Sequence, residues 1–140
     1  MSGFGRNSSW MRRVARWFAG PVMALAGINH FVMPQTYATI IPDGLPAPMA
    51  LVYASGAAEL LGGLGTMHPR TRRMAGWLLV TTLVLVFPGN LYMAQNADDY
   101  PGIPGGQLTL LARLPFQALF IYWVWLAALS DEQEPRPESA

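Results

Sequence analysis

Four long apolar stretches, separated by short segments rich in proline and glycine, dominate the pattern of hydrophobic and polar positions. A helix that crosses a membrane needs about 20 mostly apolar residues, and residues 14–33, 48–67, 74–94 and 108–129 meet this requirement. Prolines in the breaks between these stretches favour helix ends there. We therefore predict an all-α protein, a bundle of four transmembrane helices.

The first connection predicts a further, short helix. Pro34 is of the type favoured at a first helical position. Tyr37, Ile40 and Ile41 would then share one face, which suits an element lying on the bilayer surface. The chain thus divides into a basic N-terminal segment (1–13), a membrane domain (14–129) and an acidic tail (130–140) that we expect to be disordered.

Arginine placement predicts the orientation of the helices. Cytoplasmic segments of membrane proteins are enriched in Lys and Arg. Here seven arginines lie at the N-terminus and between the second and third stretches, and the other two connections contain acids but no cation. We expect both termini in the cytoplasm and a multi-pass protein in a bacterial inner membrane. The seven arginines are Arg6, Arg12, Arg13, Arg16, Arg70, Arg72 and Arg73.

A cleaved signal peptide is an alternative reading of the N-terminus. Basic residues precede an apolar run that contains Ala24-Leu25-Ala26, a sequence compatible with a cleavage site. Against cleavage, Pro21 interrupts the apolar region, and the hydrophobic run continues to Met33.

Composition narrows the chemistry. Of the 140 residues, 52% are hydrophobic and 12% are charged, whereas an ordinary globular domain has about 25% charged residues. There is no cysteine, which excludes a disulfide, a thiolate metal site and a thiol relay within this chain. A net charge of +1 provides no basic surface for nucleic acid.

Polar side chains within the predicted spans are the candidate functional residues, because an ionisable group in a bilayer is costly and needs an explanation. With a rise of about 1.5 Å per residue, all of them fall in the outer half of the membrane, and Glu59 lies deepest, near the midplane. We therefore predict a polar pocket there. The residues are His30, Glu59, Asn90, Arg113 and Gln117.

Small residues predict which way Glu59 faces. Ser55, Glu59 and Gly63 form a ladder at i, i+4 spacing, beside a second ladder of Ala50, Ala54, Ala58 and Gly62. Small residues mark close contact between helices in membranes, so the Glu59 side chain should point into the protein. Our preferred arrangement is an ion pair between Glu59 and Arg113, bridged by Gln117.

Each candidate also has a purely structural interpretation. His30 can hydrogen-bond a carbonyl at the interface, and Asn90, which follows Pro88-Gly89, can satisfy backbone groups freed by a kink. Arg113 can extend toward the headgroups, and Glu59 can serve packing alone. These alternatives stay open at the level of the sequence.

The inventory of residues restricts the reaction types. His30 and His68 lie on opposite sides of the predicted membrane and cannot share one haem iron. No spacing specifies a metal site, a phosphate-binding loop or a nucleophile with a paired base. What remains is a pocket that could hydrogen-bond and protonate a small carbonyl compound, for instance a quinone. The candidate catalytic residues are Glu59 and His30, and the candidate cofactor-binding residues are His30, Asn90, Arg113 and Gln117.

An ordered set of motifs between Gly20 and Trp125 resembles the DoxX-like family of small membrane proteins. The motifs are Gly27-Ile28-Asn29-His30-Phe31, Pro34, Tyr37, Ile41-Pro42, Leu45-Pro46, Ser55-Gly56, Glu59-Leu60, Gly62-Gly63, Pro69, Thr71-Arg72-Arg73, Phe87-Pro88, Asn90, Tyr92-Met93-Ala94, and Arg113, Pro115 and Gln117. The resemblance implies a four-helix membrane bundle. Named members include a subunit of a thiosulfate:quinone oxidoreductase and a partner in a membrane oxidoreductase complex for thiol and oxidative stress. This chain differs from what those members imply in having no cysteine, so it cannot carry out thiol chemistry with its own side chains.

We expect, on these grounds, a redox-associated membrane subunit with quinone as the candidate cofactor; whether the chain is itself an enzyme stays open. Candidate partners are the lipid bilayer, a membrane-bound or peripheral redox protein, and a second copy of the chain. Two alternatives remain. One is a non-catalytic scaffold or assembly factor, and the other is a small permease.

Overall fold

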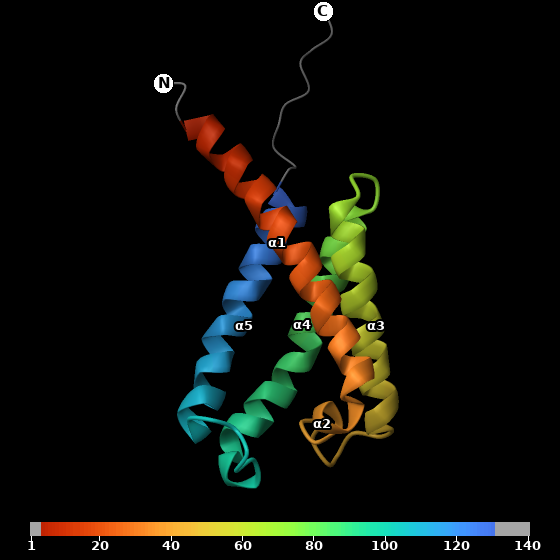
Figure 1. The fold of residues 1–140 in the computed structure, drawn as a ribbon, viewed down its shortest axis with the longest axis vertical. Coiled ribbons are helices and arrows are strands. Elements are labelled where there is room, and N and C mark those ends of the chain that lie inside the picture. Colours follow the sequence, from red (N-terminus) through yellow and green to blue (C-terminus); the bar gives the residue numbers. More distant parts are fainter. Residues whose placement is uncertain (1–3, 131–140) are drawn as a thin grey trace, which may run out of the picture.

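The computed structural model describes residues 4–130 and contains only helices as regular elements in that range (Figure 1). The predicted all-α class is therefore confirmed. The elements are α1 (Phe4–Val32), α2 (Pro34–Ala38), α3 (Pro48–Met67), α4 (Arg72–Gln95), the 3-10 helix η1 (Ala97–Asp99) and α5 (Gly106–Ala128).

The helix bounds follow the predicted apolar stretches closely, apart from the start of α1, which lies at Phe4 and not near residue 14. The short helix α2 begins at Pro34 as predicted, but it ends at Ala38, so Ile40 and Ile41 lie beyond it. The predicted disordered tail, from residue 131 on, falls outside the described residues.

Among the described residues, two helices, α4 and α5, are long and apolar enough to cross a membrane. Only 28% of the most apolar window of α4 and 22% of that of α5 are buried within the protein, so most of this apolar surface faces outward. A core helix of a soluble domain would bury most of such a surface.

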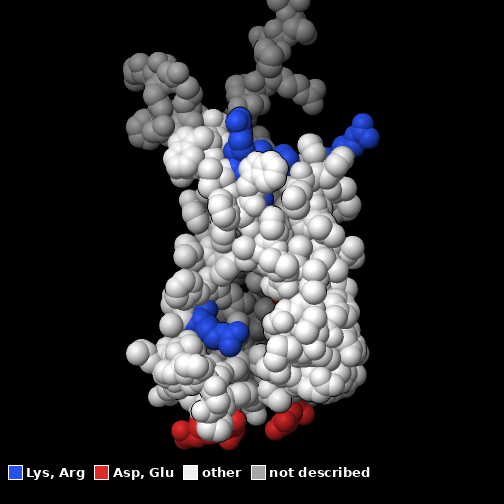
Figure 2. Space-filling model, viewed as in Figure 1, with Lys and Arg blue, Asp and Glu red and all other residues white. Residues whose placement is uncertain are grey.

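Charged side chains lie at opposite ends of the molecule (Figure 2). We refer to the end with the termini and the α3–α4 connection as the basic end, and to the opposite end, with α2 and the α4–α5 connection, as the acidic end. Between them, among the described residues, the charged side chains are the exposed Arg113 and the buried Glu59. The predicted separation of arginines from acids along the chain is thus a separation in space.

The helices pack in a ring in which α1 contacts α3, α3 contacts α4, α4 contacts α5, and α5 returns to α1. Helices α1 and α3 form the closest pair, because glycines let their backbones meet: a Cβ atom on Gly63 would lie 2.5 Å from the backbone nitrogen of Ala24, and one on Gly20 would lie 2.9 Å from the carbonyl oxygen of Gly63. This pair, the α1–α3 hairpin, confirms the predicted close contact along the ladder of Gly63. In the second ladder, Ala50 and Ala54 are exposed.

Helices α4 and α5 form a second antiparallel pair, the α4–α5 hairpin. It is close near the basic end, where a Cβ atom on Gly76 would lie 2.6 Å from the Cβ atom of Ala128, and it is close again near the acidic end, where Met93 and Leu110 are both buried.

The two hairpins share a core from the middle of the molecule to the basic end. Met23, Leu79, Leu83 and Val124 form one buried cluster, and a second contains Ala15, Ala19 and Ala127. The Nε atom of Arg16 donates a hydrogen bond of 2.8 Å to the carbonyl oxygen of Ala127, which fixes α1 to α5.

At the acidic end, connecting segments join the hairpins. The Tyr100 hydroxyl donates a hydrogen bond of 2.6 Å to the carbonyl oxygen of Thr39. Desolvation raises the pKa of Tyr100, as do, to a lesser extent, nearby Tyr92, Asp99 and Asp43, so the hydroxyl keeps its proton at neutral pH. Ile40 packs near Gly89, whose Cβ position lies 3.3 Å from Ile40 Cγ2. Thr39, Ile40, Gly89 and Tyr100 together form what we call the acidic-end cap.

Candidate functional site

His30 on α1 and Glu59 on α3 form a buried polar pair. Their side chains are 9% and 7% exposed, and His30 Nδ1 lies 3.5 Å from Glu59 Oε2. The same Nδ1 lies 2.9 Å from the carbonyl oxygen of Ala26. A carbonyl only accepts hydrogen bonds, so Nδ1 carries a proton and donates it there. Glu59 Oε2 is buried and has no hydrogen-bond partner.

Glycine and tyrosine hold the His30 ring in place. A Cβ atom on Gly56 would lie 2.5 Å from the Cβ atom of His30, so only glycine lets the histidine lie against α3. On another side Tyr37 of α2 stacks on the imidazole, with ring centroids 3.8 Å apart and planes inclined by 22°. Asn29 Nδ2 donates a hydrogen bond of 2.8 Å to the Tyr37 hydroxyl, which fixes the stacked ring.

Asn90 on α4 and Gln117 on α5 form a second polar pair. Asn90 Nδ2 donates to Gln117 Oε1 at 2.8 Å, and Gln117 Nε2 donates to the carbonyl oxygen of Leu83. Pro88 lies within α4 and cannot donate a backbone hydrogen bond, which disturbs the ladder around the preceding turn. Gln117 thus supplies a donor to the backbone of α4 shortly before Pro88, and the pair connects α4 to α5.

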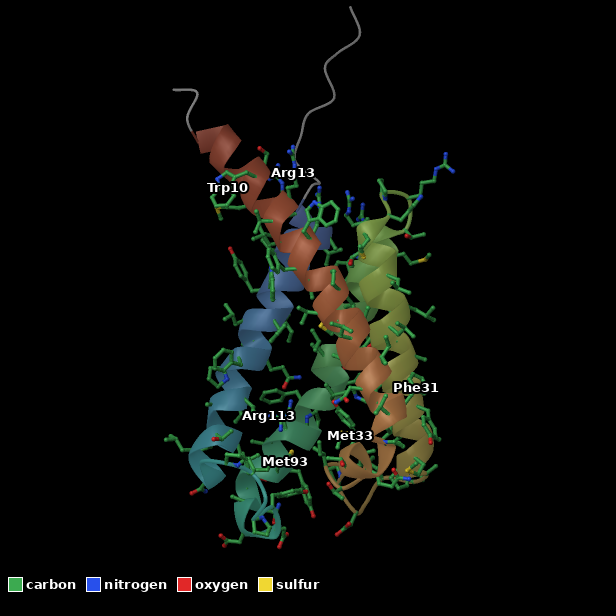
Figure 3. The ribbon with its side chains drawn as sticks, in the orientation of Figure 1. Trp10, Arg13, Phe31, Met33, Met93 and Arg113 are labelled. Carbon is green, nitrogen blue, oxygen red and sulfur yellow. The ribbon has the colours of Figure 1, made fainter. Side chains whose placement is uncertain are left out.

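Arg113 lies on α5 in the half of the molecule toward the acidic end (Figure 3). Its side chain is exposed, whereas His30, Glu59 and Gln117 are buried and Asn90 is half-buried. Figure 2 shows basic side-chain atoms away from the two ends of the molecule, at the edge of a hollow on the side where α5 and α1 lie (Figure 1). We call this recess the lateral hollow.

The proposed bridge from Glu59 through Gln117 to Arg113 does not form. Both polar atoms of the Gln117 side chain bond to Asn90 and Leu83, and the ion-pair partner within reach of Glu59 is His30. The reason is the ring order of the helices: α3 and α5 face each other across the ring and are not packing neighbours. The prediction that Glu59 points into the protein is confirmed by its burial.

Sequence reasoning missed the role of Tyr37 and Asn29. The sequence places Tyr37 on an interfacial face, and the spacing of seven residues from His30 carries no signal of stacking, because a break at Met33 separates the two helices. His68 lies at the basic end of α3, apart from His30, as expected.

Chemically, the His30–Glu59 pair can exchange protons. With Nδ1 protonated, a neutral histidine has its Nε2 lone pair as an acceptor, and a carboxyl can accept or donate according to its protonation. No group of three or more His, Cys, Asp or Glu that could hold a metal ion occurs in the part of the chain that the structure describes.

The structure defines a helical protein with an outward-facing apolar surface, charged ends and buried polar pairs between neighbouring helices. Residues 19–128 match the model of a family described as Domain of unknown function (DUF8561), and the chain belongs to that family. No curated protein and no solved structure matches the chain.

Proposed function

We propose that the chain is a multi-pass membrane protein of the DoxX-like type, in which α1, α3, α4 and α5 all cross a bacterial inner membrane with both termini in the cytoplasm. Three observations support this proposal. Charges lie at the two ends, apolar side chains are exposed between them, and all four helices have the length that a bilayer requires.

Within this frame, the proposed function is that of a redox-associated subunit that binds a small carbonyl compound, with a quinone as the first candidate. The single observation that carries the proposal is the unpartnered Oε2 atom of Glu59, buried beside His30. Native proteins seldom leave a buried polar atom without a partner, and a hydroxyl of the reduced form of such a compound, a quinol, would supply the missing donor.

The chemistry requires a partner protein. Oxidation of a quinol to a quinone releases two protons and two electrons. His30 Nε2 and the Glu59 carboxylate can accept the protons, whereas the chain has no thiol for the electrons. The electrons would pass to a redox partner protein, which is the sense in which the function is that of a subunit.

Binding of a quinol to the purified protein in lipid nanodiscs tests the proposal. We expect the wild type to bind decylubiquinol and Glu59→Gln to bind it at least about tenfold more weakly, because a charge-assisted hydrogen bond contributes roughly 1.5–3 kcal/mol. Asp98→Asn, an exposed acid at the acidic end, is the matched control and should bind as the wild type does. Equal affinities of the two variants, or no binding to the wild type, would refute the proposal.

A scaffold is the second candidate, and the Asn90–Gln117 pair favours it, because this pair is satisfied entirely within the protein. In that case Glu59→Gln and His30→Ala would change only the stability of the folded protein, and no quinol would bind. Measuring thermal unfolding and binding on the same samples separates the two functions.

A further inference from the structure

The lateral hollow is closed toward the basic end. There α1 and α5 meet through Ala15, Ala19 and Ala127, which are at most 3% exposed. The hydrogen bond from Arg16 to the Ala127 carbonyl oxygen lies at the same contact. These contacts close the gap between α1 and α5 at this end.

The acidic-end cap lies across the other end. Tyr100 is bonded to the backbone of Thr39 from the opposite hairpin, and Ile40 packs on the buried cluster of Met93, Ala94 and Leu110. Tyr100 and Ile103 cover the same cluster. Connecting segments of both hairpins therefore separate the interior from the aqueous phase on this side.

Between these two closures the hollow opens sideways (Figure 2), where the ribbons of α1 and α5 diverge (Figure 1). Both helices carry exposed apolar side chains along this part of their length: Leu25 and Val32 of α1 are 65% and 70% exposed, and Phe116 and Leu119 of α5 are 59% and 58% exposed. In the proposed membrane orientation, this opening faces lipid.

We propose that the ligand reaches the hollow from within the bilayer, between α1 and α5, and is therefore an amphiphile with a long apolar tail and a carbonyl-bearing head. This inference rests on the proposed function and names its substrate class and access route. Arg113 lies at the edge of the opening and binds the head, while the tail lies along exposed apolar side chains of α5, such as Phe116 and Leu119.

Arg113 suits this role because of its chemistry and its position. A guanidinium has five N–H donors and no acceptor, and it stays charged in proteins. It can therefore donate hydrogen bonds to ligand oxygens, and it cannot accept one from a ligand hydroxyl or amine. Arg113 is exposed, and no ion pair to Glu59 occupies it in the described part of the chain. It is thus a positioning residue for the head.

The first test compares two quinones in nanodiscs: decylubiquinone, which has a tail, and the tail-less ring 2,3-dimethoxy-5-methylbenzoquinone. The affinities of both compounds are expressed in moles of quinone in the bilayer per mole of lipid, so that simple partitioning into the bilayer does not contribute to the difference between them. We expect binding of decylubiquinone and at least a tenfold lower affinity of the tail-less ring. Arg113→Gln should weaken decylubiquinone binding about tenfold. Arg70→Gln, an exposed arginine at the basic end, should have no effect.

The second test closes the acidic-end cap. Since the chain has no cysteine, the double variant Thr39→Cys/Tyr100→Cys contains only two thiols, which a bismaleimide can join across the cap. We expect the association rate of decylubiquinone to be the same before and after cross-linking. A rate that falls severalfold on cross-linking would place the route through the cap and overturn the inference.

The outcomes separate the inference from the proposed function. If both quinones bind equally, or if Arg113→Gln and Arg70→Gln behave alike, the access route and ligand class are wrong, although quinone binding stands. If neither quinone binds to the wild type, the proposed function falls as well.

Discussion

Two polar pairs lie between neighbouring helices, and they differ in how completely their hydrogen bonds are satisfied. In the α4–α5 hairpin, the Gln117 carboxamide uses both its oxygen and its nitrogen on Asn90 and the Leu83 carbonyl. In the α1–α3 hairpin, Glu59 Oε2 has no hydrogen-bond partner, and His30 lies 3.5 Å away. A saturated pair stabilises a helix contact, whereas an unsaturated one retains capacity for a ligand.

The largest expected loss of stability comes from introducing an acid into the saturated pair. Gln117→Glu removes the donor to the Leu83 carbonyl and places a carboxyl between α4 and α5. We expect a loss of about 2.5 kcal/mol in the free energy of unfolding, comparable with the insertion cost of an acid at a helix centre. Denaturation of the detergent-solubilised protein by SDS measures this loss.

The mirror substitution, Glu59→Gln, is the control for that experiment. It removes an acid from a site where one oxygen has no partner, so the stability should stay the same or rise slightly. Equal losses from the two substitutions would show that the two pairs are equivalent, contrary to the comparison.

Packing beneath His30 gives the next largest effect. Gly56→Ala places a Cβ atom 2.5 Å from the Cβ atom of His30 and 3.0 Å from the Gly27 carbonyl oxygen, so α1 must shift. Overpacking of this kind costs about 1–3 kcal/mol. Gly44→Ala is the matched control, because no atom lies within 4 Å of its Cβ position. Similar unfolding curves for the two variants would contradict the close contact.

A smaller effect is expected at Asn90. Asn90→Ala removes one hydrogen bond to Gln117, and such bonds between membrane helices contribute about 0.6 kcal/mol on average. Quinol affinity should be unchanged, because the proposed ligand contacts are His30, Glu59 and Arg113. A loss of affinity beyond that of Gln95→Ala, an exposed position on the same helix, would make Asn90 a ligand contact.

The smallest effect is the coupling between Glu59 and Arg113, which should be absent. Stability changes of Glu59→Gln and Arg113→Gln should add to within about 0.5 kcal/mol, as they do for sites without shared partners. Asn90→Ala and Gln117→Ala, which share a hydrogen bond, should deviate from additivity. Coupling between Glu59 and Arg113 in the absence of ligand would support the Gln117-bridged pair that the sequence predicts and would contradict the arrangement described above.

Much of the fold could be predicted because its signals are local. Apolar runs bounded by prolines gave α3 its bounds of Pro48–Met67, and Pro34 marked the start of α2. Burial of Glu59 followed from the small residues one turn away on either side. Each of these features depends on helix period and on residues near in sequence.

The pairing of the polar residues could not be predicted, because depth along a helix says nothing about which helices are neighbours. Glu59 and Arg113 were placed in the same half of the membrane, but α3 and α5 lie across the ring from each other. Stacking of Tyr37 on His30 depends on how α2 folds back after Met33, and no periodic pattern encodes that bend.

The join between the hairpins has a mechanical consequence. The hairpins share a packed core near the basic end, whereas at the acidic end the contacts come from connecting segments, among them the hydrogen bond from Tyr100 to Thr39. The two hairpins are thus packed directly against each other at one end and are held together through their connecting segments at the other. Separating the hairpins at the acidic end would require breaking this hydrogen bond and the contacts of Ile40, while the core near the basic end could stay packed.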